Sequence, residues 1–216
     1  MSRRSATLAL AAAYAVLAVL VAGGALSGID QWSVDHLMPG LHDGGRKPSL
    51  GEAAVPLLHA SWKTGLDVVA NVVTLPAQAL VASLLAGVCC LALRRRGRRR
   101  EALPRDESAA LAWGLAWIVA NAVEVLCKSS LARPLLHAHG HALVAFESSY
   151  PSGHALRSVL LAAAAAAVWP AARRWVALWA AATLMLLELD GFHVPSDIAG
   201  GLLLALPLIL LARRSS

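Results

Sequence analysis

The sequence predicts an all-α polytopic membrane protein, a bundle of six transmembrane helices, and three observations lead to this fold class. Of its 216 residues, 58% are hydrophobic, and the mean hydropathy of +0.62 is well above that of a soluble domain of this size. Only 15% of the residues are charged, and they gather between long apolar stretches. Six of these stretches approach the ~20 residues that a membrane-spanning helix needs. We therefore expect a single domain over residues 1–216.

The expected helices cover approximately residues 7–26, 68–93, 108–127, 155–169, 175–189 and 198–212. Pro76 predicts a kink in the second, because a proline removes one helical hydrogen bond. The last three are short and need a thin or protein-shielded setting. The first stretch also resembles a secretory signal peptide with small residues near 22–25. We favour an uncleaved first helix.

Arginine placement predicts the orientation in the plasma (inner) membrane. With a cytoplasmic N-terminus, every cytoplasmic boundary is basic, as the positive-inside rule requires. The loops 27–67, 128–154 and 190–197 then face outside. The net charge of +6 does not indicate a nucleic-acid partner, because the largest basic run follows an apolar stretch. The cytoplasmic basic residues are Arg3 and Arg4, seven arginines within 94–105, Arg173 and Arg174, and Arg213 and Arg214, which leaves six of the 19 Lys and Arg elsewhere.

The first outer loop, 27–67, is rich in glycine and proline, which favours turns. It also carries Trp32, Trp62, His36, His42 and His59. We interpret it as an interfacial loop with aromatic anchors. A lid over a site on this side is the alternative.

The first chemical cluster lies where the third apolar stretch ends. Lys128 and Arg133 are two neighbouring cations on the predicted outer side, where positive residues are disfavoured. An arginine can bind phosphate through two parallel hydrogen bonds. We interpret the pair as an anion site, and ordinary flanking charges are the alternative.

The second cluster opens the fourth apolar stretch. Ser152 is a favoured helix N-cap, Gly153 lets a ligand approach the backbone, and His154 exchanges protons near neutral pH. A helix N-terminus offers unpaired N–H groups and partial positive charge, so this segment suits a phosphate. An ordinary cap with a stray histidine is the alternative.

The third cluster opens the sixth apolar stretch. The spacing of His193 and Asp197 lets one helical face, or one tight turn, bring the carboxylate to the imidazole. Such an aspartate fixes the ring tautomer and leaves the other nitrogen free to attack. The alternative is a first-turn anion at a helix N-terminus. All three clusters fall on one side of the predicted bundle, which indicates a functional site.

Together the clusters resemble the type 2 phosphatidic acid phosphatase superfamily, the lipid phosphate phosphatases. The family's pattern is Lys…Arg-Pro, then Pro-Ser-Gly-His, then His-x-x-x-Asp, and the resemblance covers residues 128–201. It implies a membrane hydrolase without metal or cofactor, acting on a lipid phosphate. Polyprenyl phosphate or diphosphate, phosphatidic acid and phosphatidylglycerol phosphate all fit as substrates.

The resemblance also implies residue roles. His193 attacks phosphorus to form a phosphohistidine, Asp197 orients it, and His154 is the general acid and then the base. Phosphate oxygens are held by Lys128, Arg133, Ser152 and Gly153.

Two departures from the family pattern lead to a further hypothesis. Four residues rather than six separate Lys128 from Arg133, and Leu186 and Leu187 stand where the family has Ser-Arg. Arg157 lies three residues after His154 on the same helix face. We expect Arg157 to replace the missing guanidinium, with snorkelling to the interface as the alternative.

Other polar residues on the outer side leave alternatives open. His137, His139 and His141 can bind a metal but lack a clear second ligand set. The expected partners are a lipid phosphate and the bilayer. Rival functions are a non-catalytic lipid-binding or transport protein, and an intramembrane metal hydrolase. Acids near the outer ends of the third and fifth stretches can pair with the basic residues or tune a histidine: Glu124, Glu188 and Asp190.

Overall fold

The computed structural model describes residues 2–39, 65–99 and 105–214, and over these ranges the predicted all-α fold is confirmed. Short 3-10 turns are η2 (Leu75–Ala77), η3 (Val144–Phe146) and η4 (Pro170–Ala172), and β1 (His137–Ala138) pairs with β2 (His141–Ala142) in an antiparallel hairpin. The helices are α1 (Arg3–Ala22), α2 (Ser27–Leu37), α4 (Gly65–Thr74), α5 (Ala79–Arg99), α6 (Arg105–Ser130), α7 (Gly153–Val168), α8 (Arg173–Leu189) and α9 (Pro195–Ala212).

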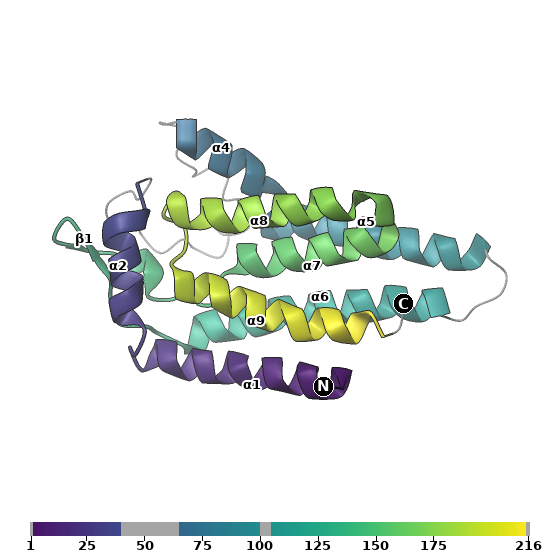
Figure 1. Ribbon diagram of the computed structural model, residues 1–216, viewed down its shortest axis with the longest axis horizontal. Coiled ribbons are helices and arrows are strands. Elements are labelled where there is room, and N and C mark those ends of the chain that lie inside the picture. Colours follow the sequence, from purple (N-terminus) through teal and green to yellow (C-terminus); the bar gives the residue numbers. More distant parts are fainter. Residues whose placement is uncertain (1, 40–64, 100–104, 215–216) are drawn as a thin grey trace.

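Six long helices run along one direction, and α2 crosses one end of them (Figure 1). They correspond to the six apolar stretches. α7 lies at the centre and packs against α5, α6, α8 and α9. Its alanine-rich second half allows this close approach, and its buried side chains join those of α5, α6 and α9 in the main core.

The second apolar stretch is broken where a kink was predicted. α4 and α5 meet at an angle of 44° across η2, which contains Pro76. Proline cannot donate a helical hydrogen bond, so backbone carbonyls near the break need other partners. The carbonyl of Ala77 finds one in the Arg157 side chain, whose Nε donates to it at 2.9 Å.

The first outer loop differs from its prediction, because part of it is helical. Ser27–Leu37 form α2, which carries Trp32 and His36 stacked on one another at 5.0 Å. His42, His59 and Trp62 lie outside the described residues. The hydrophobic pattern of the sequence did not reveal α2, because this helix is short and contains both polar and apolar residues. Apolar contacts hold α2 and the hairpin at this end: Val34, Met38, Leu136, Ala138, Leu143, Phe146 and Val194.

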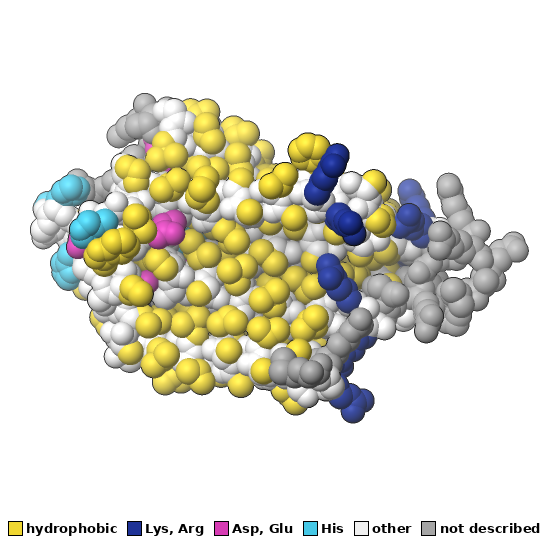
Figure 2. Space-filling model, in the orientation of Figure 1, with side chains coloured by type: hydrophobic (Ala, Val, Ile, Leu, Met, Phe, Trp, Pro, Cys, Tyr) yellow, Lys and Arg dark blue, Asp and Glu magenta, His cyan; other side chains and the backbone are white. Residues whose placement is uncertain are grey.

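The two ends of the bundle differ in charge. Arginine side chains gather at one end, which we call the basic end, while histidine and acidic side chains are visible at the other, the site end (Figure 2). A band of apolar side chains separates them. The exposed arginines of the basic end include Arg4, Arg94, Arg95, Arg96, Arg173, Arg174, Arg213 and Arg214.

Within the described ranges, three helical segments are long and apolar enough to cross a membrane: Arg4–Ala22, Ser108–Ser130 and Pro195–Ala212. The bent pair of α4 and α5 makes a fourth if it counts as one span. Large apolar side chains on the outside of the helices are widely exposed, among them Leu111 at 69% and Ile118 at 64%. An apolar surface of this extent indicates a membrane protein.

Candidate active site

The three clusters predicted from the sequence meet at the site end. Lys128 lies in the last turn of α6, and the other two clusters lie where α7 and α9 begin. The Ser152 N–H donates to the backbone oxygen of Asp197 at 2.9 Å, which ties the last two together. A Cβ added at Gly201 would stand only 2.6 Å from the Ser152 carbonyl oxygen. Glycine in α9 therefore permits this close contact.

His193 and Asp197 lie against each other, as their spacing predicts. Asp197 occupies the first turn of α9 and is fully buried. Nδ1 of His193 is 3.4 Å from Asp197 Oδ2, and Ser149 Oγ donates to the same oxygen at 2.5 Å. A carboxylate beside Nδ1 favours the tautomer that is protonated there. Nε2 then carries the lone pair.

The protonation state of His193 suits a nucleophile. Burial lowers its pKa below the usual 6.5, and the hydrogen bond and charge of Asp197 oppose that shift only in part. The residue is 8% exposed, so solvent does little to stabilise an imidazolium. The neutral imidazole is therefore the main form at pH 7.

His154, in the first turn of α7, faces His193. The two ring centroids are 6.1 Å apart with the planes tilted by 55°, and Phe192 stacks on His154 at 6.4 Å. This separation is about twice the length of a hydrogen bond, so a small group between the rings can contact both. The predicted acid and nucleophile are thus brought together.

Arg133 is buried between two carboxylates. Its Nη1 donates to Asp197 Oδ1 at 3.0 Å, and its Nη2 donates to Asp30 of α2. Asp30 also accepts from the backbone N–H of Ser196 at 3.1 Å. The Arg133 side chain is only 2% exposed. We call Asp30, Arg133, Ser196 and Asp197 the Asp30 cluster; it places Arg133 behind Asp197 rather than at an open anion site.

Lys128 and Arg157 converge on one carboxylate. Lys128 Nζ lies 2.8 Å from Glu124 Oε1, and Arg157 Nη1 lies 2.6 Å from Glu124 Oε2. Arg157 Nη1 also donates to Asn121 Oδ1 at 3.2 Å. Lys128 is 33% exposed, whereas the other two ion-pair partners are buried. We call Lys128, Arg157, Glu124 and Asn121 the Glu124 cluster.

The N-terminus of α7 adjoins this cluster. A Cβ added at Gly153 would lie 1.8 Å from Glu124 Oε1 and 2.5 Å from Arg157 Nη2. The close approach predicted for a ligand at Gly153 is thus made by a side-chain anion of the protein. Ser152 caps the helix as predicted: its Oγ accepts from the Ala155 N–H at 3.2 Å, and the residue is fully buried.

Asp30 and Ser149 are residues of this site that the sequence did not reveal. Asp30 lies in a stretch interpreted as a loop, and Ser149 has no motif of its own. One signal in the sequence pointed to Asp30: it is an acid shortly after the first apolar stretch, on the same predicted side of the membrane as Arg133. The sequence left the partner of Glu188 open. In the structure Glu188 accepts a hydrogen bond from Ser33 Oγ of α2 at 2.8 Å.

The three alternating histidines lie apart from these clusters. His137, His139 and His141 are exposed on the hairpin, which docks on α2 through Gln31. Over residues 2–39, 65–99 and 105–214, no group of three or more His, Cys, Asp and Glu side chains is placed to hold a metal ion. A metal role for these histidines gains no support from their positions.

No family model, curated protein or solved structure matches the chain. The assignment of an activity therefore depends on the geometry of the site and on the sequence motifs.

Proposed function

We propose that this protein is a membrane lipid phosphatase, a divergent relative of the lipid phosphate phosphatases, which hydrolyses a lipid phosphate or diphosphate through a phosphohistidine. One observation carries the proposal. His154 faces His193, whose Nδ1 lies against Asp197. Proton carrier, nucleophile and orienting carboxylate thus stand in the order that histidine-based phosphoryl transfer needs.

In the proposed first step, His193 Nε2 attacks phosphorus and the bond from phosphorus to the lipid oxygen breaks. His154 gives its proton to that oxygen, so the lipid alcohol leaves neutral. Asp197 stabilises the positive charge that develops on the His193 ring. In the second step, His154 takes a proton from water, which attacks the phosphohistidine and releases phosphate.

The Glu124 cluster is the proposed phosphate site. Lys128 and Arg157 share one carboxylate, so the cluster keeps a formal charge of +1 and attracts an anion. The carboxylate of Glu124, a residue of α6, reaches the N-terminus of α7, where backbone N–H groups favour an anion. A bound phosphate displaces Glu124 from the two cations, whereas Arg133 keeps its place behind Asp197.

We further propose that α1, the α4–α5 pair, α6, α7, α8 and α9 all cross the membrane, with the basic end cytoplasmic. α7 has 16 residues and α8 has 17. At 1.5 Å per residue they are about 24–26 Å long, against about 30 Å of hydrocarbon. Exposed Trp169 and Trp175 flank Arg173 and Arg174 of the basic end, and exposed Trp32 belongs to α2 at the site end, as expected for interfacial aromatic belts.

The decisive experiment measures phosphate release by the detergent-purified protein, with EDTA present. Substrates are phosphatidic acid, phosphatidylglycerol phosphate, and undecaprenyl phosphate and diphosphate. We expect release from at least one lipid, and its loss in His193→Ala. The matched control is His137→Ala, an exposed histidine of the hairpin. The phosphatase proposal fails if wild type and His193→Ala release phosphate equally.

A non-catalytic lipid-binding or transport protein is the second candidate. The observation that favours it is that both buried arginines already have carboxylate partners. Binding of a lipid phosphate without turnover, unchanged in His193→Ala, would support this reading. Release that EDTA abolishes would instead support the metal hydrolase.

A further inference from the structure

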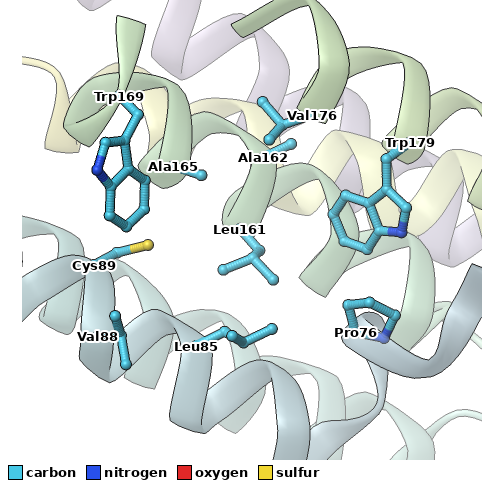
Figure 3. Close-up of a pocket in the computed structure, with 10 residues that line it drawn as sticks. All are labelled: Pro76, Leu85, Val88, Cys89, Leu161, Ala162, Ala165, Trp169, Val176 and Trp179. Carbon is cyan, nitrogen blue, oxygen red and sulfur yellow. The ribbon is translucent and has the colours of Figure 1, made fainter. Parts of the chain in front are cut away.

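An apolar cavity of about 240 Å³ lies between α5, α7 and α8, away from both polar clusters (Figure 3). Every side chain around it is apolar, apart from the indole N–H groups of its two tryptophans and the thiol of Cys89. Leu161 and Ala165 of α7 line it, with side chains of α5 on one side and of α8 on the other. Such a cavity suits hydrocarbon and offers nothing to hold a polar ligand.

The cavity opens to the outside of the bundle. Val88 and Leu85 of α5 line it and are 53% and 38% exposed, and Trp169 is 47% exposed. Pro76 and Trp179 lie on the other side of the cavity from Trp169 (Figure 3), and the Trp179 indole N–H donates to the Val73 carbonyl oxygen at 2.9 Å. A chain lying in the surrounding bilayer can therefore enter from the side.

The cavity lies along the same face of α7 as two residues of the proposed site, one helical turn farther along the helix. His154, Arg157, Leu161 and Ala165 are spaced by three, four and four residues, so they share one helical stripe. The first two belong to the polar site, and the last two line the cavity. Arg157 binds the carbonyl of Ala77, the neighbour of cavity-lining Pro76. The cavity thus begins about one helical turn, or ~6 Å, below Arg157.

We propose that this cavity holds the part of the substrate's hydrocarbon chain that lies beyond the first few carbons from the phosphate. The inference rests on the proposed function and extends it to the apolar half of the substrate. With the phosphate between Lys128 and Arg157, the chain runs down the α7 stripe toward Trp169. A cavity of about 240 Å³ has room for several methylene groups.

The test compares monoalkyl phosphates with chains from four to sixteen carbons in wild type and two filled variants. Ala165→Phe fills the cavity from α7, and Val88→Trp fills it from the exposed rim of α5, where folding is not at stake. The controls are Ala166→Phe and Leu84→Trp, which introduce the same two side chains on the same helices at residues that do not line the cavity.

Each alkyl phosphate partitions into detergent to the same extent whichever variant is assayed. The ratio of variant KM to wild-type KM therefore reports only the effect of filling the cavity. Each methylene excluded from an apolar site weakens binding about fourfold. We expect a KM ratio near one for butyl phosphate and of about ten or more for decyl phosphate. For longer chains the ratio should not rise further. kcat for butyl phosphate should not change. KM ratios near one at every chain length would overturn the proposal. The cavity would then be occupied by ordinary bilayer lipid.

A second measurement separates this inference from the catalytic one. Decylphosphonate has no phosphate ester to hydrolyse, and equilibrium dialysis measures its binding without turnover. Weaker binding in both filled variants but in neither control supports the chain site even if no lipid is hydrolysed. Equal binding in all five proteins, or no binding by the wild type, refutes the chain site even if the phosphatase activity is established.

Discussion

Arg133 and Arg157 are both buried at the site end of the bundle, but the surroundings of the two guanidinium groups differ. Arg133 lies between the carboxylates of Asp30 and Asp197. Arg157 shares the single carboxylate of Glu124 with Lys128. Counting formal charges, the Asp30 cluster holds one cation and two anions, whereas the Glu124 cluster holds two cations and one anion.

This difference in charge distinguishes the two arginines as candidates for the proposed phosphate site. A phosphate approaching Arg133 would meet two buried carboxylates, and the repulsion is strong where water is excluded. At the Glu124 cluster the excess charge is positive and Lys128 is partly exposed. The arginine that matches the family motif is thus the less suitable phosphate ligand. Arg157, which matches no motif position, is the more suitable one.

Arg133→Ala should give the largest effect on stability. It leaves two buried carboxylates without their cation, and breaking a buried ion pair in this way costs about 3–5 kcal/mol. Thermal unfolding in detergent should show a clear fall in Tm. The double variant with Asp30→Asn should recover part of the loss, because it removes one of the stranded charges. A raised KM with an unchanged Tm would instead make Arg133 a phosphate ligand.

Arg157→Ala should reduce kcat/KM by about a hundredfold, as expected when charge-assisted hydrogen bonds worth about 1.5–3 kcal/mol are lost. Its Tm should fall less than that of Arg133→Ala, since Glu124 keeps Lys128 as a partner. Arg157→Lys should recover part of the activity, because it retains the charge without the fork of donors. Arg174→Ala, at the exposed basic end, is the control. Wild-type turnover in both Arg157 variants would remove this residue from the phosphate site.

Glu124→Gln should strengthen the binding of inorganic phosphate by about tenfold, because it removes an anion that competes for Lys128 and Arg157. Phosphate should therefore raise the Tm of this variant more than that of the wild type. The variant itself should be less stable without phosphate, since its two cations lose their shared partner. If phosphate shifts both proteins equally, Glu124 does not occupy the phosphate position.

The smallest expected effect concerns pH. Because burial lowers the pKa of His193, neutral imidazole persists below pH 6.5. The acid limb of the kcat/KM profile, which reports protonation of His193, should have its midpoint below pH 6.5. The unfolded chain binds a proton first, so this group's contribution to stability is present above pH 6.5 and is lost as pH falls further. An acid midpoint above 6.5 would argue against neutral His193 as nucleophile.

The helices and the meeting of the three clusters could be predicted because each depends on local pattern. Apolar runs predict the six long helices, Pro76 predicts the break, and a spacing of four predicts the contact of His193 with Asp197. All these signals lie within a few turns of one helix. The sequence therefore predicts which residues gather at the site end.

The partners within the site could not be predicted, because they depend on contacts between distant segments. Asp30 lies 103 residues from Arg133, and Glu124 lies 33 residues from Arg157. No spacing along a single helix predicts either ion pair. The short helix α2 was missed for a related reason: it is held by packing against the hairpin and the segment before α9, not by a strong pattern of its own.

The pairing of Glu124 with Arg157 has a consequence for how the chain is made. An unpaired arginine within an apolar helix opposes membrane insertion, and Arg157 is the fifth residue of α7. α6 is synthesised before α7, and in α6 Glu124 is already neutralised by Lys128 four residues later. With α7 crossing the membrane as proposed, its arginine meets the carboxylate of a helix that was synthesised before it. The order of the two helices along the chain would thus provide Arg157 with its partner during insertion.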